Sequence, residues 1–250
     1  FRRVLFRSLL GAGQDQVLSV VFTPNDTTNY ETVNKTVEID VAKAVPTINW
    51  SDPATIVFGT ALDGTQLNAT SGIAGSFNYS PKAGTVLNAG ADQPLSVEFT
   101  PTDIANYEIV NKTVEIDVVK AVPVINWDDP AAITFGTALD GTQLNASSVI
   151  AGVFEYTPAA GTVLNAGADQ PLSVEFTPTD TANYEIANKT VEIDVVKAVP
   201  VITWGDPTTI TFGTALGGTQ LNAIANVEGA FDYTPTPGTV LNAGQNQPLR

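Results

Sequence analysis

The side chains of this sequence that are suited to binding chemistry are mostly carboxylates. Glu115 and Asp117 alternate along one apolar stretch, and Glu108 lies a few residues before them. Carboxylate oxygens are the ligands that Ca²⁺ prefers, and the ion takes roughly six to eight of them. The pattern recurs 77 residues later, so the candidate metal ligands form two sets: Glu108, Glu115 and Asp117, and Glu185, Glu192 and Asp194.

A solvated acidic face is the interpretation of these carboxylates that we favour. Alternate positions on a strand share one side of a sheet but spread their side chains apart, and no loop is dense in Asp and Asn. Exposed charges also protect a strand from edge pairing and aggregation. The sequence therefore predicts no cofactor, with Ca²⁺ binding at these residues as the alternative.

Composition argues against catalysis and against several kinds of partner. Cys, His and Met are absent, so the chain has no thiol nucleophile, imidazole base, disulfide or His/Cys metal site. The carboxylates recur in every copy, whereas a catalytic site usually occurs once, so we expect no enzyme. A net charge of −15 repels nucleic acid and anionic membrane surfaces. No apolar run approaches the ~18 residues of a membrane-spanning helix.

An internal repeat organises the chain that carries these residues. Lys43, Lys120 and Lys197 are spaced by 77 residues, and a long fixed period is typical of an array of small units. The two complete copies differ at 12 positions. We therefore divide the chain into four parts: the back part of a repeat at 9–42, complete repeats at 43–119 and 120–196, and the front part of another at 197–250.

Residues 1–8 do not belong to this pattern. They resemble the in-frame translation of a common sequencing adapter, and the repeat register begins at Leu9. Arg occurs only within 1–8 and at Arg250. We interpret residues 1–8 as an artefact at the end of a metagenomic fragment.

The differences between the copies predict short strands. Ser76, Asn78 and Ser80 change between copies while Phe77 and Tyr79 stay, which is the period of two of a strand with one wet and one buried face. No stretch has a sustained helical period, so we expect almost no helix. The strands expected in one repeat are Val45–Trp50, Thr55–Phe58, Gln66–Ala69, Ser76–Tyr79, Thr85–Leu87, Leu95–Thr100, Asn106–Val110 and Lys112–Val119.

Short strands joined by regular turns in fewer than 80 residues indicate a β-sandwich. Trp50 shares a strand face with Ile48, so we favour a buried Trp over an exposed platform for sugar rings. The expected core of one repeat is Ile48, Trp50, Ile56, Phe58, Leu62, Leu67, Phe77, Tyr79, Leu87, Leu95, Val97, Phe99, Tyr107, Ile109, Val114, Ile116 and Val118.

The stretch Asp103-Ile-Ala-Asn-Tyr107, with its copy ending at Tyr184, resembles the Asp-x-Ala-x-Tyr corner of immunoglobulin-like sandwiches. The whole unit is similar to the bacterial immunoglobulin-like repeats of large surface proteins and adhesins. The resemblance implies an all-β chain of tandem immunoglobulin-like β-sandwiches in a linear rod, outside the cell or on its surface. It also implies a tyrosine hydroxyl that bonds to the backbone upstream, and neighbouring repeats as partners.

The link between repeats is short. Lys120-Ala-Val-Pro123 joins the two complete copies without a Gly/Ser-rich spacer, and Pro123 keeps Val122 out of the helical region. We therefore expect semi-rigid stalk modules that project a functional domain from a bacterial cell. The alternative is a set of repeats that bind a cell-surface glycan, a protein or Ca²⁺ weakly and gain strength by avidity.

Two further expectations concern exposed groups. Asn-x-Ser/Thr triplets such as those that begin at Asn34, Asn68, Asn78, Asn111, Asn145 and Asn188 fit the glycosylation acceptor pattern, which is frequent by chance in an Asn- and Thr-rich chain. Part 9–42 supplies only the last three strands of a repeat, and part 197–250 lacks them. Neither part can close its own sandwich, so their edges should be poorly ordered or pair between molecules.

Overall fold

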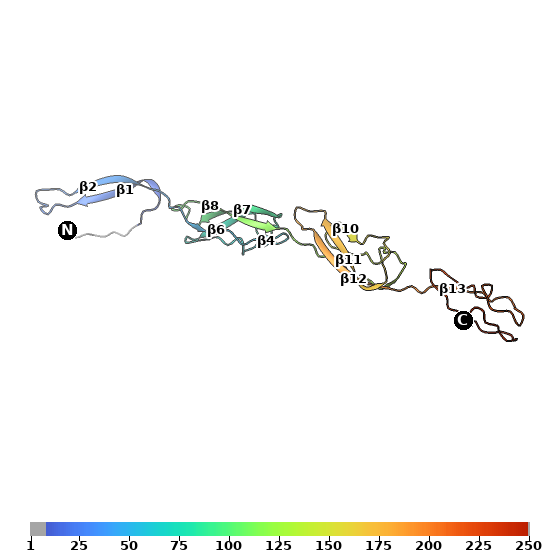
Figure 1. Ribbon diagram of the computed structural model, residues 1–250. Coiled ribbons are helices and arrows are strands. Elements are labelled where there is room, and N and C mark those ends of the chain that lie inside the picture. The colour runs from blue at the N-terminus through green and yellow to red at the C-terminus, as the bar shows by residue number, and fades with distance from the viewer. Residues whose placement is uncertain (1–8, 250) are drawn as a thin grey trace. The chain divides into compact units, whose positions relative to one another are not determined.

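The computed structural model describes residues 9–249 and contains only strands, turns and loops within that range (Figure 1). The proposed adapter segment 1–8 and Arg250 lie outside the described residues. The strands are β1 (Gly13–Phe22), β2 (Val33–Val41), β3 (Ile48–Asn49), β4 (Ile56–Val57), β5 (Thr70–Ser71), β6 (Gly75–Ser80), β7 (Gly90–Pro101), β8 (Val110–Val119), β9 (Ile133–Thr134), β10 (Gly152–Thr157), β11 (Gly167–Pro178), β12 (Ala187–Val196), β13 (Ile202–Thr203) and β14 (Ile224–Ala225).

The chain forms two compact units. The first runs to Asn126 and also takes in Ala146–Glu155 and Glu175–Lys189. The second holds Trp127–Asn145, Tyr156–Val174 and the chain from Thr190 onward. The boundary between the units passes through the second complete repeat, so the repeat boundaries remain a prediction from the sequence.

Two sheets build the first complete repeat. One has the order β4-β8-β7-β6, in which β8 pairs antiparallel with β7 and parallel with β4. The other is the antiparallel pair β3-β5. Along β8 the side chains of Val114, Ile116 and Val118 are buried, and those of Glu115 and Asp117 alternate with them on the solvent side. This is the burial pattern expected of a strand with one wet face.

The core lies between these two sheets. Leu95 and Phe99 of β7 are fully buried against Ile48 and Trp50 of the β3 region. Trp50 meets the ring of Tyr79 edge-on at 5.4 Å, and its Nε1 donates to the Gln66 carbonyl at 2.9 Å. A buried indole therefore has both an apolar and a polar partner. The predicted all-β, immunoglobulin-like sandwich class is confirmed.

Most of the expected core is confirmed, but Ile109 is exposed. The expected strand Asn106–Val110 is wrong as well, because the corner loop continues to Ile109 and β8 begins at Val110. In place of strand pairing, this loop has hydrogen bonds between its own residues and hydrogen bonds to other parts of the chain.

Two other strand predictions need correction. Gln66–Ala69 lies in a turn closed by the Leu67 N–H on the Asp63 carbonyl at 2.9 Å. Thr85–Leu87 is reduced to one bridge between Val86 and Ala61. Turn chemistry at Asp63 overrides the apolar pattern of the first segment.

The hairpin β1–β2 precedes the first complete repeat in the first unit (Figure 1). Its register, from Gly13 opposite Val41 to Phe22 opposite Val33, is that of β7–β8 shifted by one repeat. Its apolar side chains are exposed, whereas their counterparts on β7 and β8 are buried.

The second complete repeat, whose residues are divided between the two units, follows part of this plan. The sheet of the second complete repeat has the order β10-β11-β12-β9, and Leu139 and Ile193 are fully buried in its core. The segment from Val201 onward adds only the two-residue strands β13 and β14, which pair antiparallel. Leu216 and Leu221 are its buried apolar side chains. Residues 9–249 include no helix that is long and apolar enough to cross a membrane.

Candidate functional site

The corner loop Asp180–Tyr184 is tightly tied within itself. The Asp180 carboxylate accepts hydrogen bonds from the backbone N–H of Asn183 and, at 2.8 Å, from its Nδ2. The Tyr184 N–H donates to the Asp180 carbonyl at 3.1 Å. A short acidic side chain that bonds to a residue just downstream is a common way to close such a turn.

Asn183 connects this loop to the preceding repeat, and both lie in the first compact unit. Its Oδ1 accepts the backbone N–H of Ala89 at 2.8 Å, and its Nδ2 also contacts the Asn88 Oδ1 at 3.4 Å. The side chain is buried. A buried amide whose oxygen and nitrogen are both bonded fixes the two loops against each other.

The linker between the repeats lies on the same loop. The Ala121 N–H donates to the Asn183 carbonyl at 3.0 Å, and the Glu185 N–H donates to the Ala121 carbonyl at 2.9 Å. Ala121 therefore pairs with Tyr184 in a parallel bridge. The chain just after β8 is held by the corner of the repeat that it enters.

Tyr184 contributes its ring to this contact. It meets Phe58 of the preceding repeat edge-on, with ring centroids 5.3 Å apart. The hydroxyl bond implied by the immunoglobulin resemblance is absent for Tyr184 and Tyr107 among the described residues. The corner is closed by the Asp–Asn pair, which leaves the tyrosine ring available to the preceding repeat.

An equivalent contact links the hairpin β1–β2 to the first complete repeat. The Asn106 Oδ1 accepts the N–H of Ala12 at 2.6 Å, and Ala12 is the counterpart of Ala89. The Ala44 N–H donates to the Asn106 carbonyl at 2.9 Å, as Ala121 does to Asn183. We call these two sets of contacts the Asn106 junction and the Asn183 junction. Their recurrence shows that the same sequence builds the same junction twice.

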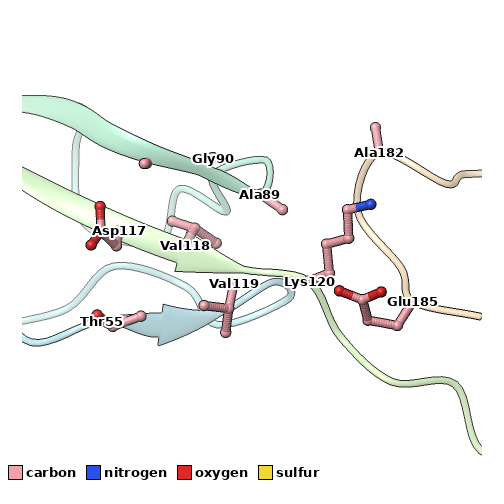
Figure 2. Close-up of a pocket in the computed structure, with 10 residues that line it drawn as sticks. Thr55, Ala89, Gly90, Asp117, Val118, Val119, Lys120, Ala182 and Glu185 are labelled. Atoms are coloured by element: carbon pink, nitrogen blue, oxygen red, sulfur yellow. The ribbon is translucent and has the colours of Figure 1, made fainter.

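A shallow depression of about 450 Å³ lies beside the Asn183 junction. Figure 2 shows Lys120 reaching from the end of β8 toward the loop that carries Ala182 and Glu185. Asp117 lines the far side of the depression, near Thr55. Its walls are shallow and of mixed polarity, which is unlike the enclosed, mostly apolar pockets that hold small ligands.

The candidate Ca²⁺ ligands of the first repeat are placed on different elements. Glu115 and Asp117 lie on the exposed face of β8, whereas Glu108 lies in the corner loop before it. The Asp117 Oδ1 accepts the N–H of Asp92 at 2.9 Å, at a bulge where Asp92 has a φ of 52°. That carboxylate therefore has a structural partner on the neighbouring strand.

Four carboxylates line a depression of about 170 Å³ in the second unit: Asp129, Asp169, Glu192 and Asp194. The Asp194 Oδ1 accepts the Asp169 N–H at 3.0 Å, and the Asp129 Oδ1 accepts the Glu192 N–H at 2.9 Å. Glu185 lies in the corner loop. Within residues 9–249 no three such side chains are arranged to hold a metal ion.

Hydrogen bonds lower the pKa of several exposed carboxyls. The Asn106 side chain holds the pKa of Asp103 below its ordinary value of 3.8. The Thr65 N–H, 2.7 Å from the Asp63 Oδ1, lowers the pKa of Asp63 in the same way. Bonds from N–H donors stabilise the ionised form, so these groups are charged at neutral pH.

Trp50 and Trp127 are buried, so the interpretation of these residues as core side chains is confirmed. Both donate from Nε1 to a carbonyl, of Gln66 and Gln143 respectively, at 2.9 Å. They present no open ring face for stacking on a sugar.

Comparisons with known proteins assign no family to the chain. No protein-family model matches the chain, and no curated protein matches it. Among solved structures, titin domains Z1Z2 in complex with telethonin are 12% identical, with 64% of this chain and all of that chain covered and a TM-score of 0.26. Sidekick-1 immunoglobulin domains 1–4 are 11% identical, with 82% and 76% covered and a TM-score of 0.19.

A third similar structure, zebrafish RET cadherin-like domains 1 to 4, is 10% identical, with 82% and 64% covered and a TM-score of 0.21. With TM-scores this low, none of these likenesses carries an argument about the chain.

Sequence reasoning found the corner loop but missed what it does. The signal was present in Asn106 and Asn183, which are retained at the fourth position of the motif while its second position varies. A polar residue that is retained while a neighbouring position of the loop changes suggests a side chain with a hydrogen-bond partner. The partner atom, a backbone N–H one repeat away, has no signature in the sequence.

Proposed function

We propose that this chain is a run of spacer modules from a bacterial surface protein of the adhesin type, which hold a functional domain away from the cell. The observation that carries the proposal is the Asn183 junction, with its counterpart at Asn106. Each junction ties a corner loop to both the linker and the repeat before it. Contacts on both sides of a short linker restrict the motion between two modules, which a spacer requires.

The remaining surface fits this role. The chain carries 26 acidic residues against 11 basic ones, and a surface of high net charge keeps repeated modules soluble and apart. Several carboxylates, among them Asp63, Asp103 and Asp117, have structural partners in turns and bulges, and a spacer has no need of a catalytic site. A location outside the cell or on its surface follows from the proposed role.

A measurement of reach tests this function. One, two or four copies of residues 43–196 are placed between a membrane-anchored tag and a fluorescent head, and the height of the head is measured by fluorescence interference. We expect a constant increment for each added repeat, on the order of 30 Å, which is the span of a strand of eight to ten residues. A height that does not depend on copy number contradicts the proposal.

Weak Ca²⁺ binding by repeated modules is a second candidate, and the four carboxylates around the second-unit depression, which are not arranged as a ready-made metal site, are where it is tested. Ca²⁺ binding there would neutralise charge between β11 and β12 at Asp169 and Asp194. Calorimetric titration with Ca²⁺ tests it, with Asp169→Asn as the altered variant and Glu155→Gln, which is outside the depression, as the control. Heat that Asp169→Asn alone removes supports binding, and the absence of heat contradicts it.

A further inference from the structure

The side chain of Asn183 has groups of opposite polarity on its two sides. On one side the backbone N–H of Ala89 donates to its Oδ1 at 2.8 Å, and a backbone N–H can only donate. On the other side the Asp180 carboxylate accepts from its Nδ2 at 2.8 Å, and an ionised carboxylate can only accept. Both neighbours therefore require the same orientation of the amide, with its oxygen toward Ala89 and its nitrogen toward Asp180.

Asp180 uses both of its oxygens in this arrangement. Its Oδ1 accepts the backbone N–H of Asn183 at 3.2 Å, and its Oδ2 accepts from the side-chain Nδ2. A carboxylate supplies two acceptors side by side, whereas an amide or a protonated carboxyl supplies one acceptor and one donor. A neutral group of this shape at position 180 would therefore set a donor against one of the two N–H groups of Asn183.

Turning the Asn183 amide over would relieve that conflict but would create another one at Ala89. The Oδ1 would then accept from the donor at position 180, and the Nδ2 would face the Ala89 N–H. Two donors would meet at a buried side chain, where an unpaired polar group is costly. The charge of the exposed Asp180 is thus connected, through one amide, to a hydrogen bond with the preceding repeat.

We propose that Asp180 is the positioning residue of the Asn183 junction, and that its negative charge is what holds Asn183 toward the preceding repeat. The junction is closed while this carboxylate is ionised, and it loosens when acid protonates the carboxylate. The inference rests on the proposed spacer function and deepens it, because it names the group that regulates the stiffness of the array.

The same pairing is built at the Asn106 junction. Asp103 accepts from the N–H and the Nδ2 of Asn106 at 3.1 and 2.8 Å, and the Asn106 Oδ1 accepts the Ala12 N–H. The bond from the Asn106 side chain is the first cause that holds the pKa of Asp103 below its ordinary value of 3.8. A pairing that lowers a carboxyl pKa is fully present above the ordinary pKa and is lost as the pH falls through the lowered value. Acid should therefore loosen a junction of this kind.

Other charged side chains lie beside the Asn183 junction, and their response to pH has to be separated from that of Asp180. They are Lys120, Glu185 and Asp117, which line the shallow depression, and Asp92, which is bonded to Asp117. The stretch 146–152, whose Ala151 carbonyl accepts the Thr179 N–H, contains no titratable side chain. Glu185→Gln therefore serves as the control that removes a nearby charge outside the Asp–Asn pair.

Nuclear magnetic resonance of the full chain measures the Ala89 bond directly. In chain labelled at alanine, the Ala89 signal is the one that Ala89→Gly removes. A bonded backbone N–H exchanges with water more slowly than an open one. We expect Asp180→Asn to raise the exchange rate of the Ala89 N–H at least about tenfold, the size expected for the loss of one hydrogen bond at a buried side chain. Thr181→Ile is the matched control and should leave the rate unchanged, because Ile104 occupies this position in the preceding repeat.

An exchange of the two residues tests polarity apart from size and net charge. In the double variant Asp180→Asn with Asn183→Asp, the amide at position 180 accepts the backbone N–H of residue 183 and donates to the new carboxylate. The second oxygen of that carboxylate accepts the Ala89 N–H. Asn88, whose Oδ1 lies 3.4 Å from the Asn183 Nδ2, is exposed and can turn its amide to match.

The double variant should return the exchange rate of the Ala89 N–H to that of the parent chain. A double variant in which Ala89 exchanges as fast as in Asp180→Asn overturns the proposal. If Asp180→Asn alone does not fold, the double variant is compared with the parent chain, and rapid exchange of its Ala89 N–H overturns the proposal in the same way.

A titration with acid tests the role of the charge. As Asp180 is protonated in the folded parent chain, the amide proton signal of Ala89 should move toward the position of an unbonded amide. This movement should be absent in Asp180→Asn and should remain in Glu185→Gln. A movement that Asp180→Asn retains, or that Glu185→Gln abolishes, overturns the proposal.

These measurements report one hydrogen bond and do not depend on reach. If the height of the fluorescent head does not rise with copy number but Asp180→Asn still frees the Ala89 N–H, the spacer function is wrong and Asp180 remains the positioning residue. If the height rises as expected but the Ala89 N–H exchanges at the parent rate in Asp180→Asn, the positioning role is wrong and the spacer function stands.

Discussion

The surroundings of Gly75, and not its backbone angles, require a glycine at this position. It begins β6, opposite Pro101 of β7, and a Cβ there would come within 2.6 Å of the buried Phe99 ring. Phe99 is fully buried between the sheets, so the ring cannot withdraw without opening the core. The close approach of strand and ring excludes any side chain at this position.

Gly75→Ala should therefore destabilise the first complete repeat by about 1–3 kcal/mol, the range for an overpacked core. Urea unfolding of the full chain measures the change. Gly72→Ala serves as the control, since Gly72 has open space around it and its counterpart is Val149. Equal stability of the two variants would refute the packing argument.

The hydroxyl of Tyr184 should be dispensable, because the ring alone contacts Phe58. Tyr184→Phe is expected to change the free energy of unfolding by less than about 0.5 kcal/mol. Tyr184→Ala should cost more, since an edge-to-face aromatic pair contributes about 0.5–1.5 kcal/mol beyond its buried area. Thermal unfolding of both variants checks this; a large cost for Tyr184→Phe would instead support a hydroxyl bond within the corner.

The carboxyl of Asp63 should make the stability of the folded chain depend on pH in the acidic range. Its folded pKa is lowered below 3.8 by the Thr65 N–H, so the folded state binds a proton less readily than the unfolded state. The contribution is therefore complete above pH 3.8 and is lost as the pH falls through the lowered pKa. The melting temperature of the parent chain minus that of Asp63→Asn should shrink between pH 5 and pH 2. A difference that is constant over this interval would contradict the assignment.

At the scale of elements, alternation in the sequence predicted β6, β8 and the second half of β7, but it missed the part of β7 from Gly90 to Pro94. The predicted strands have one inward and one exposed face, so their pattern and their environment agree. The alternating pattern gave a wrong prediction in loops that are held in place by hydrogen bonds of polar side chains. Asn106–Val110 looks like a strand because Tyr107 and Ile109 alternate, yet Asn106 directs its bonds to Asp103 and to the preceding hairpin.

The same limit applies to the candidate site. The sequence located the corner through its repetition, but the role of Asn183 depends on a backbone N–H at Ala89, and any residue except proline provides that donor. The candidate carboxylates were identified by their residue type alone. The hydrogen bonds that Asp117 and Asp194 accept from the N–H groups of Asp92 and Asp169 depend on a bulge, and only the strand register defines that bulge. Long-range backbone contacts are therefore the part that sequence reasoning did not reach.

At the scale of the whole molecule, the account depends on whether the junctions limit motion between repeats. Asn183 joins three parts of the chain: its own corner, the linker at Ala121 and the loop at Ala89. Removing its side chain leaves the Ala89 N–H without a partner, a loss of about 1–3 kcal/mol for a buried donor. Replacement of Asn183 by alanine should therefore loosen the junction without unfolding either repeat.

The distance between two spin labels on neighbouring repeats tests this most directly. The chain has no Cys, so Lys82→Cys and Ala159→Cys create the two labelling sites, both exposed and in equivalent positions. Pulsed electron resonance on labelled chain diluted with unlabelled chain should give one narrow distance distribution, which Asn183→Ala broadens. The exposed Asn188→Ala should leave it narrow. A broad distribution in the parent chain, or one that Asn183→Ala does not change, would contradict the spacer account.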